Sequence, residues 1–489
     1  MPDPQQDPAE EPSGALADAA DAYEAVLGRH GEVVTFDISS LDHLGVPVTS
    51  SSLLVDGRFA AQGNGYGLTP DAARVSGLGE LAEGVLAADR VRTLRTRARR
   101  EAYADLVRRE GADRVAHPAT LCLPAGSPWE PGTVLDWVPL TRVRTGEEVW
   151  APLDLVASDP ADVEGAAGPG LVTPVTNGLG AGLDEGRPVL HGLLEVLQRH
   201  TNGLRFRALD ARSPEIDVTG LADLDAEVAA LAARFAAEGV EPVFKHAATA
   251  YGVCSTYVMG VDGDDAVPVR LTAGGEAADP SVARSLLKAL LEHANSRARK
   301  AFCFGDREAA RAVADPRYWA AVERSTSPGE PRAVAAMRAW HELGADRLRA
   351  LTAPDRSRSV ALASTAVPDA RRPGLPGVLD ALDGHDVLAA TGRDGDAWVA
   401  KVLATGLEVE TMSYGRIGEL GVADLLTTDL GLVRVGDGPT EGHPARVVLT
   451  ADAEERLGGP AWFSYAAAER VVGPLYPLYR EPPRHLVEV

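Results

Sequence analysis

The most informative segment of this chain reads TNGLGAGLDEGRPVLHGLLEVLQRH, residues 176–200. From Pro188 onward, leucines recur at spacings of three and four, which predicts an amphipathic helix. His191, Glu195 and Arg199 follow one another at intervals of four on the adjoining face. An acid and a base therefore lie one helical turn apart, beside the buried stripe.

A second helix of the same design is predicted earlier, over residues 69–88. It begins with Thr69, a capping residue, followed by Pro70, whose missing N–H costs nothing at the first helical position. Two glycines near its middle lower its helical propensity. Glu80 and Glu83 are three residues apart and share one face, so two carboxylates point the same way.

A third helix is predicted to begin with Asp279-Pro280-Ser281, with Glu292, Asn295 and Arg297 near its end. Periodicity alone leaves two interpretations of the three helices open. In the first, their polar faces are solvated, and an acid and a base one turn apart form only a weak surface ion pair. In the second, the carboxylates converge on Mg²⁺ ions that hold a triphosphate.

The rest of the chain predicts one large α+β domain between a tail and an appended segment. Residues 1–14 lack a hydrophobic pattern and indicate a disordered acidic tail. Residues 15–417 form the main domain, which opens with a helix and shows no evident repeat at periods of 20 to 50 residues. Residues 418–489 form an appended Pro- and Gly-rich segment, whose proline-rich end favours extended structure. Strand-like runs are predicted at residues 33–38, 52–55, 133–138, 149–153, 243–245, 256–259 and 399–403.

Composition excludes several classes of function. The chain has 489 residues, and its 71 acidic and 48 basic side chains give a formal net charge of −23, which disfavours nucleic-acid binding. No apolar run approaches the ~18 residues of a membrane span, and the acidic start does not resemble a signal peptide, so we expect a cytoplasmic protein. The three cysteines are far apart, which argues against a disulfide framework or structural zinc.

Familiar catalytic motifs are missing. The sequence has no GxxxxGK[ST] loop, no HExxH and no GxSxG elbow. Glycine clusters at residues 63–67 and 178–182 approach GxGxxG but place a leucine where the last glycine belongs. His191 could bind a transition metal one turn before Glu195, but no third ligand is evident nearby, so a histidine packed beside the site is the stronger interpretation.

Three motifs, in order and with their internal spacing kept, resemble those of the YcaO family. The resemblance extends over residues 40–420 and implies an α+β YcaO-like fold, with helices packed on mixed β-sheets around a central nucleotide cleft. The matching positions are Gly65-Tyr-Gly67, Ala73, Ser76, Glu80 and Glu83 in the first motif, Thr176 to Leu183 and His191 to His200 in the second, and Ala273-Gly-Gly275, Ala289 and Glu292 to Arg297 in the third.

The resemblance implies ATP- and Mg²⁺-dependent activation of a backbone amide in a ribosomally synthesised precursor peptide. A nucleophile adds to the amide carbonyl, the resulting oxyanion attacks the γ-phosphate, and phosphate leaves, giving a thioamide, azoline or amidine. Such a protein must position the amide and screen the triphosphate. By motif position, the implied Mg²⁺ ligands are Glu80, Glu83, Glu195 and Gln198, and the implied nucleotide contacts are Ser76, Asn177, Glu292, and the two phosphate-neutralising catalytic residues Arg199 and Arg297.

Four departures from the family pattern fall within these motifs. Tyr66 stands where the family often has lysine, Gly84 replaces an arginine, and Leu183 replaces a polar asparagine. Gln198 replaces a metal-binding glutamate, which removes one negative charge and should lower the affinity for metal. Three of the four expected carboxylates remain, so we interpret the site as active but divergent.

The carboxyl end also departs from the azoline-forming members, which often end in PxPxP. This chain ends LVEV at residues 486–489, with its last prolines further back, which favours a thioamide or amidine product. The stretch before the first motif is short for a fused leader-binding domain. We therefore expect a separate leader-binding or sulfur-handling partner protein besides the precursor peptide, and leave a homodimer open.

A second hypothesis belongs to another class of function. The chain would be a YcaO-shaped binding or scaffold subunit that has lost nucleotide turnover and holds peptide or stabilises a catalytic partner. Gly84, Leu183 and Gln198 support it. Mg²⁺-dependent ATP binding separates the two hypotheses.

Overall fold

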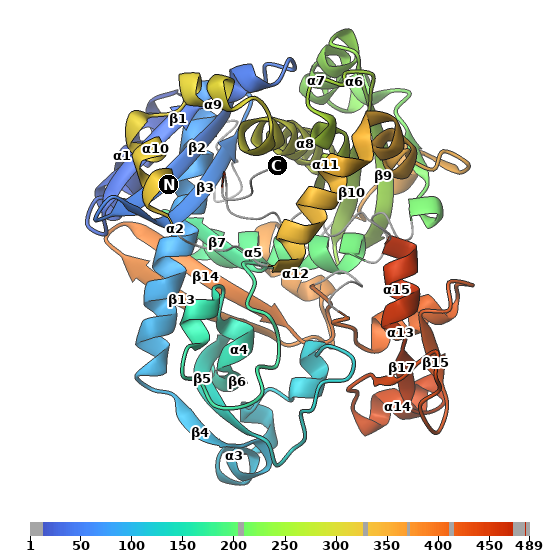
Figure 1. Cartoon of the computed structure of the whole chain (residues 1–489). Helices are drawn as coiled ribbons and strands as arrows, with labels where there is room; N and C mark the ends of the chain where they lie inside the picture. The colour runs from blue at the N-terminus through green and yellow to red at the C-terminus, as the bar shows by residue number, and fades with distance from the viewer. Residues whose placement is uncertain are drawn as a thin grey trace.

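The computed structural model describes residues 13–203, 210–325, 331–368, 372–409, 415–472 and 485. Its described strands form four sheets, with helices packed on their faces (Figure 1). This arrangement confirms the predicted α+β class. Among the described helices, none is long and apolar enough to cross a membrane.

The amino-terminal sheet is antiparallel and three-stranded, and the long helix α2 (Pro70–Arg95) lies along it (Figure 1). Its strands are β1 (Glu32–Asp37), β2 (Val48–Val55) and β3 (Arg58–Tyr66). Helix α1 (Ser13–Leu27) is the helix predicted to open the main domain, and it packs against α2. The sequence analysis did not predict β3, because its second half is rich in glycine and lacks an alternating apolar pattern.

Two larger sheets build the rest of the main domain. One has the strand order β4 (Arg99–Ala102), β5 (Val134–Arg142), β13 (Val387–Asp394), β14 (Ala397–Ala404) and β7 (Leu179–Gly182), with β6 (Glu148–Pro152) paired to β5. The other has the order β11 (Gly274–Asp279), β10 (Val253–Asp262), β9 (Val240–Ala250), β8 (Glu215–Asp217) and β12 (Ser359–Ala361). Within the described chain, β8 and β12 pair in parallel and the other pairs are antiparallel. Each strand-like run predicted from the sequence overlaps a strand of the amino-terminal sheet or of these two larger sheets.

Further helices cover these sheets. Those that carry the motifs are α5 (Gly186–Gly203) and α8 (Val282–Phe304). The others of the main domain are α3 (Tyr103–Glu110), α4 (Leu153–Val156), α6 (Leu221–Leu224), α7 (Ala226–Ala237), α9 (Arg307–Val313), α10 (Pro316–Arg324), α11 (Pro331–Thr352) and α12 (Gly374–Ala381).

The three motif helices each follow a strand directly, as β3–α2, β7–α5 and β11–α8. In every unit a glycine of the strand is pressed against the backbone of its helix. A Cβ at Gly65, Gly180 or Gly275 would collide with the carbonyl oxygen of Ala73, Pro188 or Ala289, respectively. The glycine clusters that approach GxGxxG are thus explained by strand–helix packing.

The three strand–helix units form a closed ring. Helix α2 contacts β7, α5 contacts β11, and α8 contacts β3, so each helix touches the strand of the next unit. Figure 1 shows β7 and α5 in the middle of the molecule, between β3 and the strands β9 and β10. The predicted absence of repeats concerned periods of 20 to 50 residues, and these units fall outside that range. The units lie much further apart than the 20 to 50 residues of a solenoid repeat, so a search at those periods cannot find them.

The helix ends differ from the predicted ends where apolar contacts continue. Thr69 caps α2 as predicted, and its Oγ1 accepts a hydrogen bond from the Ala72 N–H at 3.2 Å. The helix runs beyond residue 88 because Val91 and Leu94 are also buried. Helix α8 continues to Phe304, so Arg297 lies well inside it and not near its end.

The described part of the appended segment has a small core of its own, drawn in red in Figure 1. It contains α13 (Glu419–Leu426), β15 (Val433–Val435), β16 (Ala445–Arg446), α14 (Ala451–Leu457), β17 (Ala461–Phe463) and α15 (Tyr465–Val472). The extended structure predicted for the proline-rich end concerns residues outside the described ranges. The division of the chain at residues 14 and 417 stays a prediction.

Glu408 ties the appended segment to the main domain. Its Oε1 accepts hydrogen bonds from the N–H groups of Gly418 (2.7 Å) and Gly421 (2.9 Å), at the amino end of α13. The residue is 1% exposed, and its Oε2 has no partner among the described residues. Burial raises the pKa of Glu408 to about 7, against the lowering effect of the two backbone donors.

Candidate functional site

Each of the three motif helices carries a glutamate that accepts a hydrogen bond from the backbone of its own strand or of the residue directly before it. The pairs are Glu80 with the Asn64 N–H (2.7 Å), Glu195 with the Gly178 N–H (2.8 Å) and Glu292 with the Glu276 N–H (2.8 Å). The acceptor is Oε2 in every case. The repeated bond fixes the three carboxylates on rigid elements, which suits a binding site.

Glu83 links the first unit to the second. Its Oε1 accepts a hydrogen bond from the Ala181 N–H on β7 at 3.1 Å, and the Nε2 of His191 lies 3.7 Å from the same oxygen. The pKa of Glu83 is raised well above its usual range, first by burial and then by the negative charges of Glu195 and Glu80. The structure therefore brings Glu80, Glu83 and Glu195 into one electrostatic environment.

Arg199 lies between two carboxylates. Its Nη2 donates to Glu195 Oε1 at 3.2 Å, and its Nη1 donates to Glu276 Oε1. The Arg199 and Glu195 side chains are only 11% and 21% exposed. The i,i+4 pair predicted from spacing is present, but it does not lie on a solvated face.

Glu276 is a member of this cluster that the sequence analysis missed. It lies on β11 directly after the Gly-rich loop of the third motif. Burial, followed by the negative charge of Glu276, raises the pKa of Glu292, while Arg199 lowers it. One signal in the sequence could have found Glu276: it is the longest side chain in a strand that otherwise holds glycine, alanine and one aspartate.

Ser76 and Gln198 are both half-buried on the motif helices. Ser76 lies one turn before Glu80 on α2, and Gln198 lies three residues after Glu195 on α5. These spacings place each residue on the face that carries its neighbouring acid. Their proposed contacts with nucleotide and metal stay predictions.

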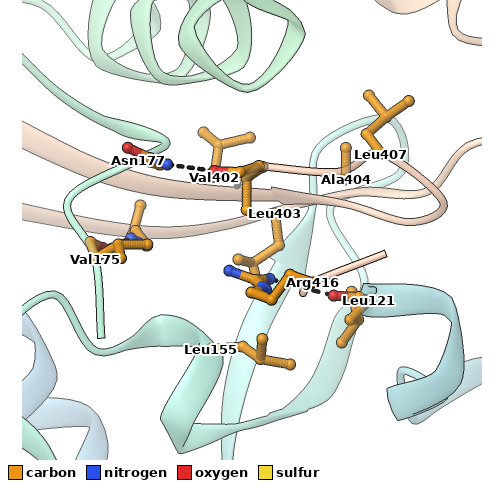
Figure 2. Close-up of a pocket in the computed structure, with 11 residues that line it drawn as sticks. Leu121, Leu155, Val175, Asn177, Val402, Leu403, Ala404, Leu407 and Arg416 are labelled. Atoms are coloured by element: carbon orange, nitrogen blue, oxygen red, sulfur yellow. Dashed lines mark hydrogen bonds between the residues drawn. The ribbon is translucent and has the colours of Figure 1, made fainter. Parts of the chain in front are cut away.

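Asn177 lies just before β7, at the edge of a small pocket (Figure 2). Its Nδ2 donates to the carbonyl oxygen of Val409. Figure 2 shows Asn177 on one side of the strand that carries Val402 and Leu403, and Arg416 on the other. The pocket volume is about 20 Å³, room for one or two water molecules but not for a nucleotide. A nucleotide contact of Asn177 would have to be made outside this pocket.

The structure places Arg297 away from the carboxylate cluster. Its guanidinium is 1% exposed, and donates to Asp42 Oδ2 at 2.9 Å and to Asp262 Oδ2 at 2.7 Å. Arg270, also buried, donates to Asp42 Oδ1 at 3.0 Å. The predicted role of Arg297 as a phosphate contact finds no support in this geometry, because its donors are engaged by two buried aspartates. We therefore leave Arg297 out of the proposed site.

The fit of Mg²⁺ was tested on the carboxylates themselves. Within the described ranges, no three Asp, Glu, His or Cys side chains lie close enough to hold a metal ion alone. The pKa values of two of these carboxylates are nevertheless raised, and a bound cation would offset the repulsion between them and their neighbours. Mg²⁺ is commonly held by one or two carboxylates together with water and substrate phosphates. The residues fit a metal ion that arrives with a nucleotide. They do not supply a complete set of metal ligands by themselves.

The family departures fall at positions with little steric constraint. A Cβ at Gly84 would meet only Ala61, at 4.0 Å, so an arginine could be accommodated there. Leu183 is exposed at the end of β7, and Tyr66 packs against apolar residues of β1, β2 and α8.

The fold and the site together define a class of protein. It is an α+β protein in which three glutamate-bearing strand–helix units close into a ring around an acidic candidate site for a cation and nucleotide. Residues 64–408 match the model of a family described as YcaO cyclodehydratase, which binds ATP and Mg²⁺. The chain therefore belongs to the YcaO family, as the motif resemblance predicted, and the family's ligands are the cofactors predicted from the motifs.

Relatives and solved structures agree with this assignment. An uncharacterized protein of Methanothermobacter thermautotrophicus is 30% identical over 57% of this chain and 68% of its own length. An uncharacterized protein of Mycobacterium tuberculosis is 29% identical over 37% of this chain and 39% of its own length. The structure of YcaO from Methanopyrus kandleri, bound with AMPPCP and Mg²⁺, has a TM-score of 0.56 and 20% identity, covering 86% of this chain and 98% of that one. A heterocyclase in complex with substrate and cofactor has a TM-score of 0.57 and 16% identity, covering 85% of this chain and 55% of that one. At these identities the two structures show the fold alone.

Proposed function

We propose that this protein uses Mg²⁺ and ATP to activate a backbone amide of a ribosomally synthesised precursor peptide. The product would be a thioamide, azoline or amidine. The proposal rests on family membership and on one observation of this structure. Carboxylates of the second and third strand–helix units contact Arg199, and the pKa of Glu83 is raised by burial and then by the negative charges of Glu195 and Glu80.

The chain's own residues would bind and orient the reactants. Glu80, Glu83 and Glu195 offer hard oxygen ligands from rigid helices, and Gln198 offers a neutral oxygen on the same face of α5. Arg199 would turn toward phosphate once cations neutralise Glu195 and Glu276. Magnesium, when bound, would screen the triphosphate charge. Positioning and charge neutralisation are the main requirements of phosphoryl transfer to an amide oxygen.

The substrate and partners belong to the same proposal. The heterocyclase with substrate and cofactor shows this fold with both kinds of ligand together, although at low sequence identity. We infer a precursor peptide as the substrate, and a separate leader-binding or sulfur-handling protein as the partner. A cytoplasmic location is part of this proposal.

The scaffold hypothesis remains the second candidate. A specific observation favours it: Gln198 lacks the charge of the family's glutamate, and Arg297 is engaged by Asp42 and Asp262. Under this hypothesis the chain would keep the fold and hold a peptide or a partner, without turning over ATP.

Calorimetric titration of the purified chain with ATP, with and without Mg²⁺, tests the enzyme proposal. We expect Mg²⁺-dependent binding by the wild type, and phosphate release when peptide and partner are supplied. Glu195→Gln keeps an oxygen for the Gly178 N–H but removes the charge, so it should weaken binding by tenfold or more, about 1.4 kcal/mol. Glu80→Ala should abolish peptide modification while the protein stays folded.

Glu241→Gln is the matched control. Glu241 is exposed on β9 and pairs with Arg356, far from the motif helices in sequence, so its variant should bind ATP like the wild type. Wild-type protein that binds no ATP at millimolar concentration would favour the scaffold. Unchanged product yield with the Glu80 or Glu195 variants would remove those residues from the site.

A further inference from the structure

Glu276 is an unusual residue for its place in the fold. Strand β11 is otherwise built of glycine, alanine and a terminal aspartate, and it packs against α8. The Glu276 side chain is only 11% exposed. A buried carboxylate costs free energy unless it is paired, so its presence on this strand calls for a reason beyond packing.

The contacts of Glu276 join the second and third strand–helix units. Its side chain accepts a hydrogen bond from Arg199 on α5, and its backbone N–H donates to Glu292 on α8. Its charge also acts on the Glu292 carboxyl, as does that of Glu195. Glu276 therefore lies at the junction where the two units bring their acids together.

A comparison of the three units shows what the second one lacks. Each motif helix has a glutamate followed, three residues later, by a second oxygen-bearing side chain on the same face. The pairs are Glu80 with Glu83, Glu195 with Gln198, and Glu292 with Asn295. Only the first pair has two charges. Asn295 is 5% exposed, and its Oδ1 has no partner among the described residues, so it is directed into packed protein.

The strand that carries Glu276 is held rigidly. In register, Glu276 stands beside Tyr257 of β10, which in turn stands beside Lys245 of β9. Tyr257 is fully buried and donates through its hydroxyl to Asp210 at 2.6 Å. A carboxylate on such a packed sheet can be presented to a ligand with little loss of conformational entropy.

We propose that Glu276 supplies the anionic oxygen that Gln198 does not, so that a divalent cation arriving with ATP is held between α5 and β11. The inference rests on the proposed Mg²⁺- and ATP-dependent function. Arg199, which pairs with Glu276 and Glu195, is released toward the phosphates when the cation binds. A competing interpretation is that Glu276 only orients Arg199.

Relocating the charge distinguishes these two interpretations. The full chain would be compared with Glu276→Gln, Gln198→Glu and the double variant, and the Mg²⁺ concentration for half-maximal ATP binding would be measured by calorimetry. We expect Glu276→Gln to raise this concentration by about tenfold or more, because a hard anionic ligand is lost. The double variant should return to within about threefold of the wild type.

The controls separate the possible failures. Glu241→Gln, on an exposed site of the same sheet, should leave the Mg²⁺ requirement unchanged. If Glu276→Gln weakens ATP binding equally at all Mg²⁺ concentrations and the double variant does not recover, Glu276 acts only on Arg199 and the inference is overturned. If the wild type binds no ATP, the proposed function fails as well. Should Glu276→Gln fold poorly by circular dichroism, Glu276→Asp, which keeps the charge, is measured in its place. ATP binding by this variant that no longer depends on Mg²⁺ would also overturn the inference.

Discussion

Two charged regions share helix α8 and differ in their balance of charge. One has an excess of carboxylates, and the other pairs its charges almost completely. Five residues before Arg297, Glu292 faces the carboxylate cluster, in which glutamates of the second and third units accept hydrogen bonds from Arg199. Arg297 itself lies in a buried network with nearly balanced charge. The carboxylate cluster consists of Glu80, Glu83, Glu195, Glu276 and Glu292. The buried network consists of Arg270, Arg297, Asp42 and Asp262, with the partly exposed Asp264 bonded to Arg270 at its edge.

The difference indicates which region folds the protein and which binds a ligand. In the buried network each guanidinium forms an ion pair with a carboxylate. Removing one partner would therefore leave an unpaired charge in the interior. In the carboxylate cluster the acids outnumber the cation, and burial together with neighbouring carboxylates raises the pKa values of Glu83 and Glu292. Such an arrangement weakens the folded chain and is relieved by added positive charge. We therefore assign structure to the first and ligand binding to the second.

The largest expected effect tests that assignment at Arg297. Arg297→Met should lower the free energy of unfolding by about 3–5 kcal/mol, because Asp42 and Asp262 lose their buried partner. Denaturant unfolding followed by circular dichroism measures this. Glu292→Gln, on the same helix, is the matched variant and should keep its stability while losing Mg²⁺-dependent ATP binding. An Arg297 variant as stable as the wild type but unable to bind ATP would restore the phosphate contact predicted from the motif.

The next effect concerns Glu408, a buried carboxylate held by two backbone donors. Because its pKa is raised to about 7 in the folded state, the folded chain holds this proton more tightly than the unfolded chain does. Stability should therefore fall as pH rises from the usual carboxyl range to about 7, by roughly 2–3 kcal/mol from this residue. Glu408→Gln keeps an oxygen for Gly418 and Gly421 and should remove that dependence.

The measurement is the difference in unfolding free energy between wild type and Glu408→Gln across pH 5 to 8. Glu441→Gln, at an exposed position of the appended segment, serves as the control. A pH-independent difference between wild type and Glu408→Gln would show that Glu408 is not buried as a titrating group. It would also contradict the link that Glu408 makes between the main domain and the appended segment.

The smallest expected effect lies inside the carboxylate cluster. Glu83→Gln removes one of several mutually repelling charges, so it should raise the unfolding free energy by about 1 kcal/mol at a pH where the wild-type carboxyl is ionised. The gain should shrink at lower pH, where the wild-type carboxyl is already protonated. The same variant should lose Mg²⁺-dependent ATP binding in calorimetry. A variant that is less stable than the wild type, with binding intact, would place Glu83 with the structural residues and remove the contrast between the two regions.

Local spacing predicted much of the candidate site. Helical periodicity places Glu80 with Glu83 and Glu195 with Arg199 on common faces, and the structure keeps these relations. Thr69 and Ser281 cap their helices because their side chains reach backbone N–H groups a few residues away. Interactions of this range depend on the chain within one or two turns, so the sequence alone could reveal them.

Contacts between units were beyond the reach of such reasoning. Glu276 and Arg199 are 77 residues apart, and Arg297 and Asp42 are 255 residues apart. Nothing in the spacing of a helix says which neighbouring strand will face it. The motif resemblance therefore placed Arg297 with the phosphates and overlooked Glu276.

The sequence by itself determined the three glutamate-bearing helices, the capping residues of α2 and α8, the glycines that let each strand approach its helix, and membership in the YcaO family. Only the tertiary structure decided which acids share one space, that Glu276 joins them, and that Arg297 is engaged elsewhere by Asp42 and Asp262. The physical reason is that side-chain direction along a helix is fixed by backbone geometry, whereas the energy of a charge is set by whichever distant residues the fold packs around it.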